Sequence, residues 1–238
     1  QLTWMDAMVG DGVVTPRAGT PVEIAALWYN ALERVAALVR ASGRAADAYE
    51  ALAKRARAGF ERFWNAGAGC CYDVVDGPAG NDASVRPNQL FAVSLPHAVL
   101  DGERARGVVD VCARLLLTSC GLRTLSPEDP RFAPHYGGDQ RQRDGAYHQG
   151  TVWPWLIGAF ACAHARAYGD AATARSFLEP FADQLRERGL GTIGEIADAA
   201  APFAGRGAIA QAWSIAEILR AWTDLSTLHG TFEEYGAP

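Results

Sequence analysis

The chain has 238 residues, of which 49% are hydrophobic, 21% charged and 10% aromatic, a composition typical of a globular protein with one sizeable core. Its net charge of −5 at pH 7 argues against a nucleic-acid partner, because binding to phosphates needs a basic face. The sequence contains neither an apolar stretch of about 18 residues nor a basic segment followed by an apolar leader, so we expect no membrane span and no export.

Helical patterns dominate the chain. The first and clearest follows Thr20–Glu23, which resembles a capping box with Pro21 at the first helical position. Apolar residues then recur at helical spacing until Ser42 and Gly43 end the pattern. In the sixth helix, Pro180 is expected to cause a kink or a break. The expected helices, about seven in all, cover residues 24–39, 45–64, 87–100, 102–118, 150–168, 171–188 and 207–225.

Other segments are predicted to form loops or short strands. Residues 70–83 are rich in Gly, Asn and Asp and favour a small hairpin over a loop. The long connection 119–149 is of a kind that is more often functional than decorative. Within it, Asp139–Asp144 is expected to be a solvated loop. Gly137 and Gly138 do not open a strand-to-helix turn, so nucleotide binding is not predicted.

The five cysteines do not suggest a disulfide framework, because their number is odd and Cys70 and Cys71 are adjacent. Cys112 and Cys162 lie within helical patterns, as small core residues do. This usage favours a reducing compartment, and we therefore expect a cytoplasmic protein. There is no Cys-x-x-Cys pair, and the five histidines are not at metal-ligand spacing, so neither a metal nor another cofactor is predicted.

The helices alternate between two kinds. Those at 24–39, 150–168 and 207–225 are rich in Trp and Ala and are expected to be buried, whereas the helices between them carry charged stripes. Inner and outer helices in alternation suggest a toroid of helical hairpins. The absence of a fixed-period repeat argues against a consensus solenoid. With no linker to divide it, residues 1–238 are expected to form a single all-helical domain.

Two carboxylates stand at the edges of Gly- or Trp-containing loops, Asp6 in Thr3–Asp6 and Glu195 in Gly191–Ile196. Glycosidic bond cleavage needs a pair of carboxylates, one to donate a proton and one to activate water or attack. Apolar neighbours such as Trp4 would raise the proton affinity of Asp6, as a general acid requires. Glu195 would then be the general base. Considered singly, each residue is as consistent with a structural cap or loop carboxylate.

Tryptophans near helix starts and loops strengthen the carbohydrate interpretation, because sugar rings stack on their faces. Core packing is an equally good explanation for Trp28 and Trp155. The segment Tyr147–Trp155 clusters His, Gln, Thr and Trp where a long loop enters a buried helix. Asn88 and Gln89 at another helix start suit either hydroxyl binding or capping.

Several ordered motifs resemble the C-terminal domain of glycogen debranching enzyme, and together they span nearly the whole chain. They are Thr3–Ala7, Val9–Asp11, Val13–Arg17, Pro21–Ile24, Ala26–Leu32, Arg86–Ala92, Leu125–Pro127, His148–Trp155, Gly194–Ile196 and Ala210–Ser214.

This resemblance implies an (α/α)6 toroid and amylo-α-1,6-glucosidase activity on glycogen or another α-glucan, with inversion at the anomeric carbon. Asp6 matches the general acid of the family and Glu195 its general base. Since about seven helices are predicted here, we expect the C-terminal part of the toroid, with an N-terminal part of the same enzyme as its partner. The expected pocket walls are Trp4, Trp28, Trp153 and Trp213. The expected hydroxyl contacts are Asp11, Asn88, Gln89, His148, Gln149 and Gln211.

The sequence departs from the family pattern at three positions. Gly12 stands where the family usually has a bulky aromatic residue. Ala200 and Phe203 align with places where the family commonly has an acidic residue and a histidine. The second and third changes lie close to Glu195, so they affect substrate preference and bear on catalytic competence.

Two alternatives remain open from the sequence. One is a different glycosidase on the same toroid, such as a glucoamylase-like or trehalase-like enzyme. The other is a glucan-binding module that has lost its chemistry through the altered loop beside Glu195. A generic helical interaction domain is a weaker third possibility, and it would have no pocket lined by carboxylates.

Overall fold

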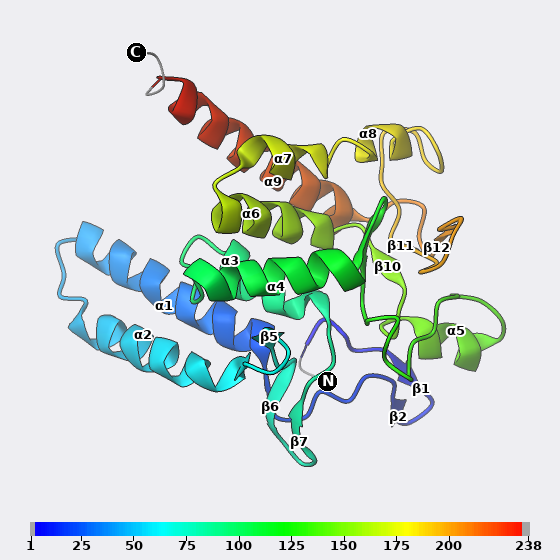
Figure 1. Ribbon diagram of the computed structural model, residues 1–238, viewed down its shortest axis with the longest axis horizontal. Helices are drawn as coiled ribbons and strands as arrows, with labels where there is room; N and C mark the ends of the chain where they lie inside the picture. The colour runs from blue at the N-terminus through cyan, green and yellow to red at the C-terminus, as the bar shows by residue number, and fades with distance from the viewer. Residues whose placement is uncertain (1–2, 235–238) are drawn as a thin grey trace.

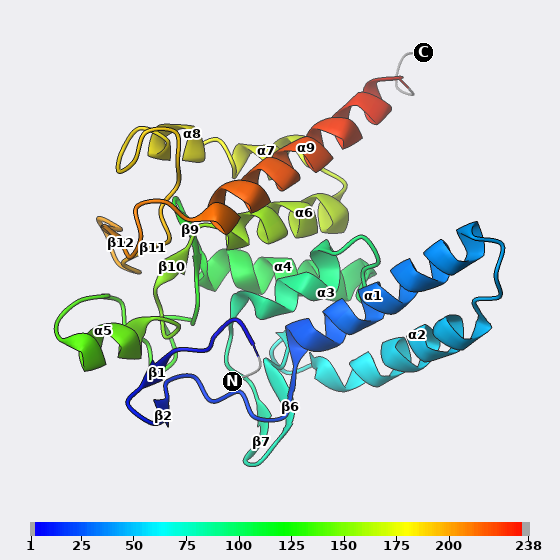
Figure 2. The ribbon, with the colours of Figure 1, turned by 180° about the vertical axis from the view of Figure 1, so that it is seen from behind.

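The structure is a computed structural model that describes residues 3–234, with side chains as far as Thr227. Two layers of helices make up most of the molecule (Figures 1 and 2). In the inner layer each helix contacts the next, in the order α1 (Val22–Ala41), α3 (Phe91–Ser94), α6 (Leu156–Tyr168) and α9 (Ala212–Glu234). The outer layer consists of α2 (Asp47–Phe60) against α1, α4 (Gly102–Leu115) against α6, and α7 (Ala171–Ser176) against α6 and α9.

Helix α6 is the centre of the core. Its side chains are buried nearly all round, including Leu156, Ile157 and Phe160, as expected for an inner helix that is apolar on every face. Gly158 allows α9 to approach closely, because a Cβ at this position would lie 2.5 Å from the carbonyl oxygen of Glu217. The predicted alternation of inner and outer helices is confirmed.

Several predicted helices have different limits from those expected. The helix predicted at 207–225 is α9, Ala212–Glu234. The helix predicted at 87–100 is instead a 3-10 turn, η2 (Pro87–Leu90), followed by the short α3. It stops because Pro96 pushes Leu95 into extended backbone (φ −67°, ψ 152°). The helix predicted to begin at residue 150 begins at Leu156, because the residues before it pair in a strand.

The prediction of a solvated loop at Asp139–Asp144 is wrong. Residues Gln140–Ala146 form helix α5, which begins with a capping box between Asp139 and Gln142. The predicted interruption near Pro180 is confirmed, since α7 ends at Ser176 and a further short helix, α8 (Phe181–Gln184), follows the proline. One more 3-10 turn, η1 (Glu61–Phe63), extends α2.

Short antiparallel strands connect the helices. The predicted hairpin is confirmed as β6 (Val74–Gly77) and β7 (Gly80–Asp82), and β6 also pairs with β3 (Thr20–Pro21). Two further pairs are β1 (Met8–Val9) with β2 (Gly12–Val13), and β4 (Trp64–Asn65) with β5 (Cys70–Cys71). A five-stranded sheet runs in the order β12 (Gly205–Arg206), β11 (Ile196–Ala197), β10 (Val152–Trp153), β9 (Gly121–Arg123) and β8 (Leu117–Thr118).

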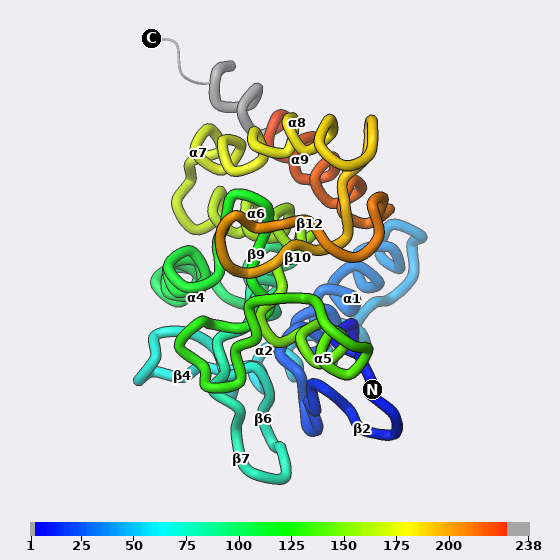
Figure 3. The backbone as a smooth tube through the Cα atoms, turned by 90° about the vertical axis from the view of Figure 1, so that its right-hand side faces the viewer, coloured from blue at the N-terminus to red at the C-terminus, as the bar shows by residue number. Residues whose placement is uncertain are grey.

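This five-stranded sheet gathers distant parts of the chain at one end of the helices. Figure 3 views the molecule from the side on which β9, β10 and β12 lie. In the sheet, Val152 is paired with Arg123 on one side and with Ala197 on the other. This pairing brings the end of the loop before Val152 next to strand β11, which begins directly after Glu195.

The row of inner helices has two open edges. Helices α1 and α9 lie at opposite ends of the row (Figure 2). Along α1 runs a stripe of exposed apolar side chains, from Ile24 through Trp28 and Val35 to Leu38, which is 70% exposed. On α9, Leu219 and Trp222 are exposed beside a largely apolar hollow of about 330 Å³ between α8 and α9. In the part of the chain that the structure describes, no helix is both long and apolar enough to cross a membrane.

Candidate active site

An aromatic cluster surrounds Trp4 at the sheet end of the molecule. The Trp4 ring meets four rings edge-on, at centroid distances of 5.0 Å to Trp155, 5.1 Å to His148, 5.4 Å to Trp153 and 6.2 Å to Trp213. The four form two stacked pairs, His148 on Trp153 at 5.3 Å and Trp155 on Trp213 at 4.8 Å. The structure therefore brings together three of the four tryptophans expected as pocket walls.

A chain of hydrogen bonds fixes the orientation of Trp4. Its indole N–H donates to Oδ1 of Asn88 at 2.8 Å, and Nδ2 of Asn88 donates to Oδ1 of Asp73 at 2.9 Å. Asp73 also accepts from Nε of Arg17 at 2.6 Å, and Arg17 donates in turn to Glu23. All four polar partners of this chain are buried, so the position of Trp4 depends on a charge cluster inside the protein.

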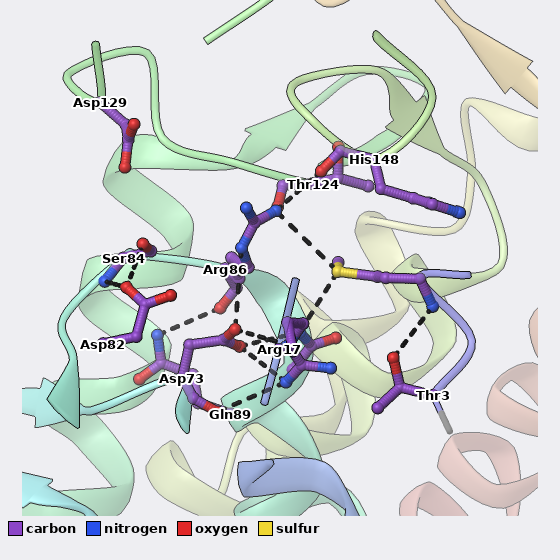
Figure 4. A network of polar contacts seen from close by, with 12 residues as sticks. Thr3, Arg17, Asp73, Asp82, Ser84, Arg86, Gln89, Thr124, Asp129 and His148 are labelled. Carbon is purple, nitrogen blue, oxygen red and sulfur yellow. Dashed lines mark hydrogen bonds and ion pairs between the residues drawn. The ribbon is translucent and has the colours of Figure 1, made fainter. Parts of the chain in front are cut away.

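Arg86 connects the same charge cluster to the loop that carries His148 (Figure 4). Its Nε lies 3.7 Å from Oδ2 of Asp73. Its Nη1 donates to the backbone oxygens of His148 at 2.7 Å and of Thr124 at 3.0 Å, and its Nη2 donates to Oε1 of Gln149 at 2.8 Å. One buried cluster therefore anchors both the segment that precedes Asp6 and the loop that carries Tyr147–Gln149.

Several buried polar groups near Trp4 lack hydrogen-bond partners among the described residues. They are both ring nitrogens of His148 and the indole nitrogens of Trp155 and Trp213. Burial, helped by the positive charges of Arg86 and Arg17, lowers the pKa of His148 to about 3. The imidazole is therefore neutral near pH 7 and carries one donor and one acceptor. Buried unpaired groups are uncommon in proteins, and a cluster of them next to carboxylates suits a ligand with hydroxyl groups.

Glu195 lies directly before β11 and accepts hydrogen bonds at both carboxylate oxygens. The hydroxyl of Tyr147 donates to Oε1, and the backbone N–H of Ala208 donates to Oε2 at 2.8 Å. The side chain of Asp6, by contrast, is exposed. Burial, the bond to Glu195, and the negative charges of Glu195 and Asp6 all raise the pKa of Tyr147. Glu195 is thus bonded to the hydroxyl of Tyr147, whereas Asp6 influences this hydroxyl only through its charge.

The remaining predicted site residues lie in varied settings. Gln89 is buried, where it accepts from the N–H of Cys71 at 3.0 Å and donates to the backbone oxygen of Arg86 at 3.2 Å. Asp11 is exposed in the turn between β1 and β2. Trp28 belongs to the exposed stripe on α1, with 55% of its surface accessible. Gln211, half-buried just before α9, donates its backbone N–H to the carbonyl of Ile193 at 2.9 Å.

The three positions that depart from the family pattern are also placed. Gly12 lies in β2. Ala200 and Phe203 form a turn between β11 and β12, in which the N–H of Phe203 donates to the carbonyl of Ala200 at 2.9 Å. Phe203 has a positive φ of 59°, and its ring lies 5.9 Å from the guanidinium carbon of Arg123.

Sequence reasoning missed several residues that build this site. Asp73 and Arg86 are polar residues whose burial depends on tertiary contacts, and no local pattern indicated it. Asp198 accepts from the N–H of Tyr136 at 2.9 Å and from Nη2 of Arg206 at 2.8 Å. Burial opposes ionisation of Asp198, but these hydrogen bonds outweigh it and lower the pKa of its carboxyl group. The pairing between Asp198 and Arg206 braces the loop after Glu195.

A sequence-family profile described as amylo-alpha-1,6-glucosidase matches residues 1–220. The chain belongs to the amylo-α-1,6-glucosidase family. One curated relative of the chain is the glycogen debranching enzyme of Saccharomyces cerevisiae. It is 32% identical over 85 residues, which are 33% of this chain and 6% of that enzyme.

Solved structures with a similar fold are glycoside hydrolases. The mannosylglycerate hydrolase of Thermus thermophilus has a TM-score of 0.62 at 21% identity, over 86% of this chain and 46% of that chain. The neutral trehalase of Saccharomyces cerevisiae has a TM-score of 0.60 at 13% identity, over 87% of this chain and 40% of that chain. The chain spans less than half the length of these proteins, and its fold is that of part of an (α/α)6 toroid.

Proposed function

We propose that this domain hydrolyses a single α-1,6-linked glucose at branch points of glycogen or a related α-glucan, with inversion at the anomeric carbon. Membership of the amylo-α-1,6-glucosidase family supports a glycoside hydrolase. The observation that supports the proposal is the setting of Glu195, whose carboxylate accepts from the hydroxyl of Tyr147. The ring of Tyr147 packs against His148 and Trp153 of the aromatic cluster around Trp4, two residues before Asp6. Two carboxylates at the edge of an aromatic wall are what glycoside hydrolysis requires.

The two carboxylates have different roles in this proposal. Asp6, protonated, donates its proton to the leaving oxygen of the branch glucose. Glu195, ionised, removes a proton from a water on the opposite face of the sugar ring. Because each oxygen of Glu195 accepts only one hydrogen bond from the groups described above, lone pairs remain for this water.

The substrate-binding assignments follow the composition of the site. The half-buried rings of Trp4 and Trp213 are the assigned contacts for a sugar, with the buried Trp153 behind them. Asp11 and Gln211 are the assigned hydroxyl contacts. Asn88, Gln89, His148 and Gln149 are buried, and the amides of Asn88, Gln89 and Gln149 are bonded within the protein, so we assign these residues to the support of the site, and Trp28 to the exposed stripe on α1.

The site is proposed to be completed by an N-terminal part of the same enzyme. The exposed apolar stripe of α1 and the exposed Leu219 and Trp222 of α9 are the flanks that such helices would cover. The share of the solved relatives that this chain spans, 46% for the hydrolase of Thermus thermophilus, agrees with a toroid completed from elsewhere. Unpaired thiols at all five cysteines are consistent with a cytoplasmic enzyme.

Turnover of branched oligosaccharides by the complete enzyme tests this function. We expect glucose release from panose or isomaltose-type branches and little release from maltose or trehalose. Glu195→Gln should lower kcat by about a thousandfold or more, because a general base is worth ~10²–10⁴ in rate, and should leave the fold unchanged. Near-normal turnover by Glu195→Gln would contradict the assignment. Preferential cleavage of maltose or trehalose would show that the substrate assignment is wrong. Glucan binding without sugar release would indicate a binding module.

A further inference from the structure

Glu195 is held from two sides by groups that sequence reasoning did not identify. We infer that Tyr147 and Gly207 are positioning residues that fix the plane of the Glu195 carboxylate, an inference that rests on the proposed function. Neither residue would take a proton from the water itself. Each acts through the carboxylate that does.

Tyr147 provides a rigid donor on the first side. Its hydroxyl donates to Oε1 of Glu195. Its ring packs against His148 at 4.8 Å and against Trp153 at 5.0 Å, and its backbone oxygen accepts from the indole N–H of Trp153 at 3.1 Å. His148 and Trp153 are both buried, so the hydroxyl has little freedom to move away from Glu195.

Gly207 provides space on the second side. Its φ of +62° is a left-handed backbone conformation that favours glycine. A Cβ at this position would lie 2.4 Å from Oε2 of Glu195 and 3.0 Å from Cγ1 of Ile196. Only the absence of a side chain lets the carboxylate reach the N–H of Ala208, which donates to Oε2 at 2.8 Å.

Together the two contacts determine how the carboxylate meets the water. With one donor on each oxygen, rotation about the final bond of Glu195 would break both hydrogen bonds. The lone pairs left over therefore point in fixed directions.

Two variants of the complete enzyme test this inference. Tyr147→Phe keeps the ring and removes the hydroxyl, whereas Gly207→Ala keeps the hydroxyl and pushes Oε2 away. We expect each to lower kcat by roughly 10- to 100-fold, the size expected for a lost hydrogen bond to a charged group, with KM within about twofold.

Matched controls separate this role from general effects of the substitutions. Tyr168→Phe removes another tyrosine hydroxyl that donates to a carboxylate, that of Asp110, in an exposed setting. Gly43→Ala places a Cβ at another left-handed glycine (φ +75°) where nothing lies within 4 Å. Both controls should retain kcat within about twofold, since neither touches Glu195.

The outcomes are distinct. Wild-type kcat in Tyr147→Phe, or a raised KM with kcat unchanged, would overturn the role of the hydroxyl. Wild-type kcat in Gly207→Ala would overturn the role of the glycine. If Glu195→Gln itself remained active, the proposed function and this inference would fail together. An inactive Glu195→Gln with fully active positioning variants would overturn this inference alone.

Discussion

The two proposed catalytic carboxylates are held in opposite ways. Glu195 is fixed directly, by a hydroxyl on one oxygen and a backbone N–H on the other. The backbone around Asp6 is anchored on both sides, by the buried Met5 and the hydrogen bond from Trp4 to Asn88 before it and by the carbonyl of Ala7, which accepts from the N–H of Val14 at 3.1 Å, after it. The Asp6 side chain is exposed. The base thus has its supporting groups within this chain, and the acid has a well-anchored backbone with an open side chain.

The difference indicates what the rest of the enzyme has to supply. A general acid must keep a proton near neutral pH, which needs apolar surroundings or a neighbouring negative charge. The residues described here leave one side of Asp6 open to solvent. We therefore expect the N-terminal part of the enzyme, or the substrate itself, to cover Asp6 and to create the environment of an acid.

The largest effect on stability is expected from the charge cluster that anchors the Asp6 segment. Asp73→Asn would leave Arg17 and Arg86 buried with too little negative charge, so the free energy of unfolding should fall by about 3–5 kcal/mol. Chemical denaturation of the domain measures this change. As a control, Asp101→Asn breaks the exposed ion pair with Arg57 (3.0 Å) and should cost less than about 1 kcal/mol. Equal effects of the two substitutions would contradict the anchoring role of the cluster.

A smaller effect on stability is expected from His148, which stacks on Trp153 in the aromatic cluster around Trp4. Its pKa is lowered from 6.5 to about 3 in the folded protein, so the unfolded chain binds a proton that the folded protein does not. Stability should therefore fall as the pH drops below about 6.5, by roughly 2 kcal/mol between pH 7 and pH 5. The variant His148→Asn should lack this dependence when the two proteins are unfolded in urea at both pH values. Parallel pH dependence in the two proteins would show that His148 is free to take up a proton when folded.

The smallest effect is expected at the open edge of the inner helices. Leu38 on α1 is 70% exposed, so Leu38→Gln should change the free energy of unfolding of this isolated chain by less than about 0.5 kcal/mol. In the complete enzyme the same substitution should cost more, because the side chain would be covered there. Equal changes in the two proteins would mean that the stripe on α1 remains open to solvent.

Local sequence signals predicted the parts of the fold that depend on local interactions. The apolar periodicity before Ser42 located α1, and Pro180 located the break between α7 and α8. The capping box predicted at Thr20–Glu23 is wrong, because Pro21 is the N-cap, no side-chain hydrogen bond caps the helix, and Glu23 binds Arg17 instead. Strand β10 was missed because two residues show no periodicity, and Val152 finds its partner at Ala197 only in the folded chain. Because β10 was not predicted, the start of α6 was placed too early, at residue 150 instead of Leu156.

The site was predictable to a similar extent. Family motifs singled out Asp6, Glu195 and the tryptophans around Trp4, because these residues stand in recognisable segments, and the roles of the two carboxylates stay predictions. Arg86 opens one of these motifs, but neither its burial nor that of Asp73 was predictable, since a charged residue in a sequence is expected at the surface and only tertiary contacts bury it. Tyr147 lay within a highlighted segment, but its bond to Glu195 joins positions that no local pattern connects.

The most direct test of the central claim is the distance between the Asp6 and Glu195 carboxyl groups in a crystal structure of the complete enzyme with a branched oligosaccharide bound. An inverting pair predicts a separation of ~6.5–9.5 Å, with the scissile oxygen beside Asp6 and a water against Glu195. A separation near ~5 Å would indicate retention instead. Carboxyl groups that face away from the bound sugar would contradict the catalytic assignment altogether.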